Sequence, residues 1–280
     1  MNALEQGPAT GWRASLALEY RCEAGRTWIA DRRHSGPLLV QKPLYPEGPG
    51  VCQTLIIHPP AGIAGGDALD VSVRVGEGAH AQITTPGAAK WYRSAGPMAT
   101  LDQGLAVAPG GRLEWLPQET IFFDGALARS RTRVDLAGDA VFLGWDLIAL
   151  GRPAAGETFD RGGLALDAEI RHQGRLVWTE RGRLAGADRL LTDAAGFGGA
   201  TAGGTLVLAG ARVGDDLLAA CREVAADDGR WGITRLPEVL VARWLGRETA
   251  TGRAWFTGLW SLLRPAVLGR EALVPRIWNT

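Results

Sequence analysis

Residues 69–85, LDVSVRVGEGAHAQITT, decide the fold class of this chain. Apolar residues occupy every second position from Leu69 to Val75, and a similar alternation resumes at Ala79 after a glycine-containing turn. A period of two places alternate side chains on opposite faces of a strand, so each half predicts a half-buried β-strand. The segment therefore predicts two short strands joined by a tight turn.

The same pattern recurs along the rest of the chain. Further strand-like segments lie at residues 51–57, 120–123, 132–136, 141–150, 164–170, 176–181, 205–209 and 239–244. Many short strands, interrupted by 39 glycines and 15 prolines, predict a mainly all-β sandwich, barrel or solenoid. No Pro- or Ser-rich linker divides the chain, so residues 1–280 are expected to form one domain, with 1–14 frayed.

Two segments follow a helical rather than a strand pattern. Residues 215–226 place their apolar side chains on one face and begin with Asp215 and Asp216, which favour a helix N-terminus. Residues 255–263 predict a second helix, which Pro265 is expected to end.

Two loops rich in glycine and proline, at residues 58–67 and 84–94, have tightly specified shapes because such turns need positive φ angles or a proline-fixed φ. No catalytic triad, phosphate loop or metal cluster accompanies them. Lys90 follows a Gly-containing turn, but Ala89 and Trp91 break the P-loop pattern, so nucleotide hydrolysis is not expected. These loops indicate a binding scaffold rather than an enzyme.

The amino-acid composition restricts the classes of partner that are expected and indicates the cellular location. Thirty basic and thirty acidic residues give a net charge of zero, so nothing points to nucleic acid or to an anionic membrane. The three cysteines, Cys22, Cys52 and Cys221, are far apart and odd in number, which argues against a disulfide framework. With no secretory signal pattern, the expected location is the cytoplasm.

Three carboxylates stand out by their context. Asp67 follows two glycines, where the ordinary interpretation is an Asx-turn. Glu180 shares the predicted face of Leu176 and Trp178, so it is expected to be paired, protonated or exposed to a wet cavity, and a buried ion pair with an arginine is the simplest case. Asp146, inside the apolar segment 141–150, raises the same question.

An enzymatic alternative remains open. A carboxylate pair drawn from Glu114, Glu119, Asp124 and Glu180 could serve a β-solenoid carbohydrate hydrolase. The four histidines form no helical zinc motif, and Cys52 and His58 would lie about 20 Å apart along one strand, so a preformed His/Cys metal site is not expected.

A family resemblance runs through nearly the whole chain. The segments that carry it are PLYPEG at residues 43–48, the loops 58–67 and 84–94, LEWLPQET at 113–120, GWD at 144–146, LGR at 150–152, GE at 156–157, WTER at 178–181, LLRP at 262–265 and PRIWNT at 275–280. Together they resemble the UreD (UreH) family of urease accessory proteins.

The resemblance implies a fold and a role. The family fold is a helical, solenoid-like stack of strands with a small C-terminal helical element. Its members act as nickel-insertion chaperones in complex with UreF, UreG and apo-urease. UreG is the GTPase, nickel is thought to pass through an internal tunnel, and no cofactor is held stably.

That role suggests functions for particular residues. Dispersed oxygen ligands hold a hydrated cation weakly enough to release it, so Asp67, Glu180 and Asp146 are the candidates for a transient nickel path. A passive adaptor with no metal path is a third possibility. Residues 255–280 carry Trp255, Trp260 and Trp278 beside several arginines, a composition that fits either a UreF interface or core packing.

Overall fold

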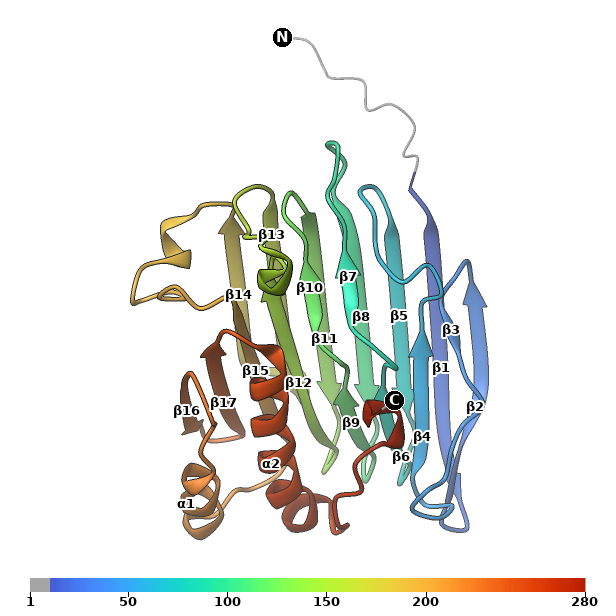
Figure 1. Ribbon diagram of the computed structural model, residues 1–280. Helices are drawn as coiled ribbons and strands as arrows, with labels where there is room; N and C mark the ends of the chain where they lie inside the picture. Colours follow the sequence, from blue (N-terminus) through green and yellow to red (C-terminus); the bar gives the residue numbers. More distant parts are fainter. Residues whose placement is uncertain (1–10, 280) are drawn as a thin grey trace.

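The computed structural model describes residues 11–279, which form two facing β-sheets with two α-helices against one of them (Figure 1). The first sheet has the order β14-β13-β11-β8-β5-β1-β2. Its strands are β1 (Arg13–Glu23), β2 (Arg26–Ser35), β5 (Ala68–Val75), β8 (Ala99–Val107), β11 (Leu127–Leu136), β13 (Gly163–His172) and β14 (Arg175–Ala185).

The second sheet has the order β16-β17-β15-β12-β9-β6-β4-β3, and the short strands β7 and β10 extend it beside β12. Its strands are β3 (Leu39–Val40), β4 (Cys52–Ile57), β6 (His80–Thr84), β7 (Ala89–Trp91), β9 (Arg112–Leu116), β10 (Thr120–Phe122), β12 (Val141–Leu150), β15 (Ala202–Ala209), β16 (Arg230–Arg235) and β17 (Val239–Gly246).

The chain winds between the two sheets as a solenoid. From β5 to β12 it alternates from one sheet to the other, and successive strands within each sheet pair in parallel. Equivalent turns at Gly78, Gly110 and Gly138 carry the chain from the first sheet to the second, each glycine at a positive φ that L-residues rarely adopt. The predicted mainly β, solenoid-like fold is confirmed.

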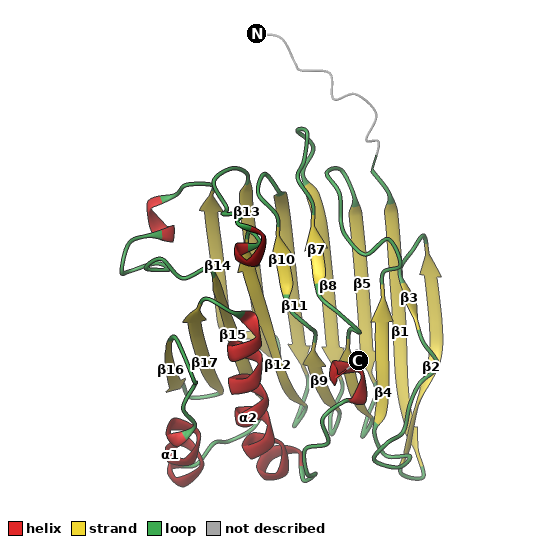
Figure 2. Ribbon diagram, in the orientation of Figure 1, coloured by secondary structure: helices red, strands yellow, loops and turns green. Residues whose placement is uncertain are grey.

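Helices α1 (Asp215–Glu223) and α2 (Thr249–Leu268) lie against one another and on the second sheet (Figure 2). Short 3₁₀ turns occur at Pro153–Ala155, Arg189–Leu191 and Arg276–Asn279. No helix among residues 11–279 has the length and apolarity needed to cross a bilayer.

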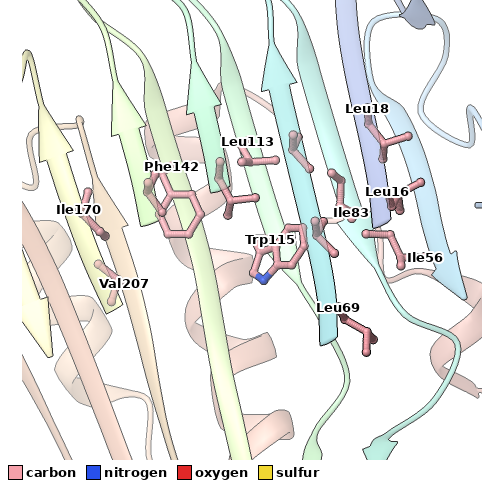
Figure 3. Close-up of a cluster of buried hydrophobic side chains, with 14 of the residues drawn as sticks. Leu16, Leu18, Ile56, Leu69, Ile83, Leu113, Trp115, Phe142, Ile170 and Val207 are labelled. Carbon is pink, nitrogen blue, oxygen red and sulfur yellow. The ribbon is translucent and has the colours of Figure 1, made fainter. Parts of the chain in front are cut away.

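Alternation of side chains produces two apolar cores. One fills part of the space between the sheets and includes Leu16, Ile83, Leu113 and Phe142 (Figure 3). The other lies between the second sheet and the helices and contains Trp244 among its members. The second sheet is therefore covered on both faces, which explains why several of its strands are apolar throughout.

Two details of the sequence-based description are wrong. Helix α2 runs through Pro265 to Leu268, and Gly269, at φ +66°, ends the helix instead, with its N–H on the Pro265 carbonyl. At the N-terminus, β1 already begins at Arg13 and Ala14 is buried, so these residues are not frayed. Residues 1–10 of the predicted frayed segment lie outside the described residues.

Candidate functional site

A cavity of about 1200 Å³ lies between the two sheets, lined by strands of both. Towards β1 and β5 the inter-sheet space is filled by large apolar side chains (Figure 3). Towards β13 and β14 the inward positions include Ala168 and Gly182, and a Cβ built on Gly182 would come no closer than 3.7 Å to any neighbour. Small residues at these positions leave the space open.

The second sheet contributes a row of three polar side chains to the cavity. Asp146 on β12 is paired in register with Thr205 on β15, and Thr205 is paired in register with Arg243 on β17. All three line the cavity. Residues in register across neighbouring strands share one level of a sheet, so the row crosses the sheet at a single height.

The first sheet provides a facing row. Glu180 on β14 is paired with Ala168, which is paired with Thr132, which in turn is paired with Gln103. These residues also line the cavity, and the Gln103 side-chain amide donates to Thr132 Oγ1 at 3.0 Å. Two polar rows therefore face the same space. We call the polar members of both rows the polar belt: Asp146, Thr205, Arg243, Glu180, Thr132 and Gln103.

An ion pair joins the two rows. Arg243 Nη2 lies 2.9 Å from Glu180 Oε1, so a side chain of the second sheet meets one of the first. Both remain partly open to water, with side-chain exposures of 58% and 37%. Glu180 therefore has the expected arginine partner, but the pair is not buried.

The predicted face of Glu180 needs a further correction. The pairing of β13 with β14 shifts between Ile170 and Arg171, so that Trp178 stands opposite Ile170 whereas Leu176 stands opposite the exposed Arg171. This irregularity places Leu176, 44% exposed, on the outer side. Of the two predicted companions, only Trp178 shares the inner face with Glu180.

Asp146 is exposed to the cavity yet surrounded by protein. Burial among protein atoms, and next the negative charge of Glu180, raise its pKa to about 6, against a partial opposing effect of the Leu147 backbone N–H. A carboxylate whose ionisation is disfavoured by burial and by a neighbouring negative charge is one that a cation stabilises. The site therefore offers oxygen ligands to a positively charged species.

Asp67 occupies a different place. It is buried, its Oδ2 accepts from the Ala64 N–H at 2.8 Å and its Oδ1 from the Trp12 N–H at 2.7 Å. Its side chain closes the 58–67 loop and is not among the residues that line the cavity. The neighbouring His58 does line the cavity, and burial lowers its pKa.

The two loops singled out in the sequence pack together. Ile63 pairs with Lys90 and Tyr92 through backbone hydrogen bonds of 2.7 and 2.8 Å. A Cβ on Gly62 would lie 2.2 Å from the Tyr92 ring, and one on Gly65 would lie 2.2 Å from Ser94 Oγ. These glycines are required for the close approach, which accounts for the restricted loop composition.

The C-terminal tryptophans belong largely to the core. Trp255 and Trp260 are 2% and 0% exposed, so neither presents a surface to a partner in this fold. Trp278 is half-buried, packs against Trp145 and Trp260, and donates to Thr84 Oγ1 at 2.8 Å. Core packing is the interpretation that their burial supports.

The carboxylates considered for a hydrolase do not face a common site. Each is held by a different arginine. The pairs are Glu114 with Arg264, Glu119 with Arg253, Asp124 with Arg161 and Glu180 with Arg243. A glycosidase pair needs two carboxyl groups flanking one bond, and these contacts place the four groups in four separate environments.

Among residues 11–279, no three or more His, Cys, Asp or Glu side chains form a group that could hold a metal ion. The polar belt instead offers two carboxylates, two hydroxyls and an amide around a wide space. Such a set suits brief contact with a hydrated cation better than a closed coordination sphere.

The sequence reasoning missed four members of the polar belt: Gln103, Thr132, Thr205 and Arg243. Arg243 had a detectable signal, since it interrupts the apolar strand 239–244 as Asp146 interrupts 141–150. The remaining three are common strand residues, and only the strand register brings them to one level.

Comparisons with known proteins agree with one another. The sequence model of the UreD urease accessory protein family matches residues 13–279. A urease accessory protein UreD of Dechloromonas aromatica (strain RCB) is 51% identical over 273 residues, which cover 96% of this chain and 95% of that protein. One from Nitrosococcus oceani is 53% identical over 269 residues, covering 96% and 90%. One from Pseudomonas fluorescens (strain Pf0-1) is 54% identical over 269 residues, covering 96% and 95%.

Proposed function

This chain belongs to the UreD family of urease accessory proteins, and from that premise we propose that it serves urease maturation by conveying nickel through its inter-sheet cavity to apo-urease. Nickel is the cargo in this proposal and is not a resident cofactor. The observation that carries it is the cavity itself, with Asp146 and Glu180 facing the same space from opposite sheets.

The chemistry of the polar belt supports transit rather than storage. A divalent cation entering the cavity would exchange part of its water shell for carboxylate oxygens of Asp146 and Glu180. Conduction needs binding that is favourable enough to admit the ion and weak enough to release it. Two separated carboxylates, one already paired with Arg243, meet both conditions.

The proposal assigns other tasks to partners. The chain carries no P-loop, so GTP hydrolysis would come from UreG within a complex that also contains UreF and apo-urease. Within this chain, Asp67 would act indirectly, by fixing the loop that carries His58 to the cavity wall.

Reconstituted urease activation tests the proposal. Apo-urease is incubated with UreF, UreG, GTP, nickel and either the wild-type chain, Asp146→Asn or Glu180→Gln, and both urease activity and urease-bound nickel are measured. The two variants are expected to enter the complex normally but to deliver several-fold less nickel, because a neutral amide replaces a negatively charged carboxylate while the size of the side chain is kept.

The matched control is Asp102→Asn. Asp102 lies on the outer face of the first sheet, one residue from Gln103, and its loss removes a carboxylate without touching the cavity. Wild-type nickel delivery by both cavity variants would contradict a nickel path and would leave a passive adaptor as the function.

A further inference from the structure

Arg243 differs from Arg264, the arginine that meets Glu114 of the second sheet. The guanidinium of Arg264 is fully buried and contacts both Glu114 and Glu47 at 2.7–3.1 Å. Arg243 meets one carboxylate oxygen and keeps more than half of its side chain in water. An exposed pair of this kind contributes little to stability, so its arginine moves at small cost.

A second carboxylate lies within reach of Arg243. Thr205 separates it from Asp146 by one strand, so the two backbones are two strand spacings, about 10 Å, apart. The long arginine side chain and the aspartate side chain together span that distance on the same face of the sheet. Arg243 therefore has two alternative anionic partners in the cavity, Glu180 and Asp146.

Among residues 11–279, no ion pair joins Asp146 to a basic side chain. The polar belt thus contains one carboxylate with a partly exposed cationic partner and one without. The other charged pairs that line the cavity, Asp167 with Arg183 and Glu169 with Arg181, are not part of the belt. The two carboxylates and the guanidinium carry a combined charge of −1 when both acids are ionised. Without Arg243 the same site would carry −2.

We propose that Arg243 is a displaceable counter-charge, which a divalent cation must move aside to reach the carboxylates and which returns to expel the cation afterwards. The inference rests on the proposed nickel-conveying function and adds how its cargo is released. A unit positive charge about 6 Å from a divalent ion weakens binding about tenfold even at the dielectric constant of water. Arg243 thereby sets the affinity of the polar belt for its cargo.

Direct nickel binding tests the proposal without any urease assay. The full-length chain, Arg243→Gln and Arg243→Lys are titrated with Ni²⁺ alone by calorimetry or equilibrium dialysis, and release to a chromogenic chelator is followed by stopped flow. Arg243→Gln is expected to bind Ni²⁺ about tenfold more tightly and to release it correspondingly more slowly. Arg243→Lys keeps the charge and should behave as the wild type.

Two further variants locate the effect. Arg131→Gln removes an arginine from the outer face of the first sheet, where it pairs with Asp102, and should leave Ni²⁺ affinity unchanged. Combining Arg243→Gln with Asp146→Asn should abolish the gain in affinity. Circular dichroism verifies that each variant is folded.

The outcomes separate the two proposals. An Arg243→Gln chain with wild-type affinity and release rate overturns the counter-charge role, as does an equal gain from Arg131→Gln. The nickel path stands in either case if Asp146→Asn and Glu180→Gln still impair delivery to urease. If those two variants deliver nickel normally, it is the path that fails.

Discussion

Glu114 and Asp146 lie on neighbouring strands of the second sheet, but they face opposite sides of it. Glu114, on β9, points towards α2 and is completely buried. His80, Trp260 and Arg264 all contact its carboxylate, at 2.6–3.1 Å. Burial alone would raise the pKa of Glu114, but the hydrogen bond and charge of His80, together with Arg264, outweigh it and lower the pKa to about 2.

Asp146, on β12, points into the cavity and responds in the opposite way. Its pKa rises to about 6, because burial and the Glu180 charge disfavour ionisation and no arginine compensates. The difference shows that one sheet holds two kinds of charge. Under α2 the ionised carboxylate of Glu114 is paired with His80 and Arg264. In the cavity the carboxylate of Asp146 has no such partner and is left available to a cation.

The largest effect on stability is expected from Glu114→Ala. The substitution leaves Arg264 and His80 buried without their shared carboxylate, and breaking a buried pair in this way costs about 3–5 kcal/mol. Urea unfolding measures the free energy of unfolding. Asp146→Asn, measured alongside, should not lower it, since no ion pair is broken and the cost of ionising Asp146 in the folded state is removed. Similar losses of unfolding free energy in both variants would show that carboxylates on the helix-covered face and on the cavity face of the second sheet contribute alike to stability.

The difference between the faces also explains what the sequence could predict. Strands with strict alternation, such as 69–75 and 164–170, were found because one face packs and the other meets water. Strand β2 was missed because, as an edge strand, it is largely exposed and its sequence, RTWIADRRHS, does not alternate.

The candidate site was predicted only in part, because a single sequence reveals local patterns and not contacts between distant strands. Asp146 drew attention as a charge within an apolar strand, which a single sequence reveals. The meeting of Glu180 with Arg243 depends on the stacking of β14 over β17, two strands of different sheets, and no local pattern encodes it. The packing of Trp255 and Trp260 was equally undetermined, because tryptophan suits both a core and an interface.

An intermediate effect is expected from pH, with opposite signs at the two carboxylates. The lowered pKa of Glu114 gives stability that is present above its unfolded value of about 4.5 and is lost as the pH falls towards 2. The raised pKa of Asp146 disfavours the folded state above pH 6, so stability from this group increases as the pH falls from about 6 to 4.

Urea unfolding between pH 4 and pH 8 isolates the contribution of Asp146, because the contribution of Glu114 is lost only below about pH 4.5. In Asp146→Asn the increase in stability between pH 6 and pH 4 should be smaller than in the wild-type chain, because the asparagine does not titrate. Ni²⁺ affinity of the wild-type chain should fall over the same interval as Asp146 gains its proton. Identical pH profiles for the two proteins would show that Asp146 ionises as an ordinary surface carboxylate.

The smallest effect on stability is expected from placing a large side chain in the inter-sheet cavity, which is also the most direct test of its role. Gly182 lines the cavity one inward position from Glu180, and Gly104 lies on the outer face of the same sheet with nothing within 4 Å of an added Cβ. Neither glycine has a positive φ, so a larger residue is compatible with both backbones. Gly182→Phe and Gly104→Phe should therefore each change the free energy of unfolding by no more than about 1 kcal/mol.

Only Gly182→Phe places a ring beside Glu180, so it alone should reduce nickel delivery to apo-urease. Equal delivery by the two variants would mean that the inter-sheet space is an incidental gap in packing, and that the contrast between the two faces of the second sheet has no bearing on urease maturation.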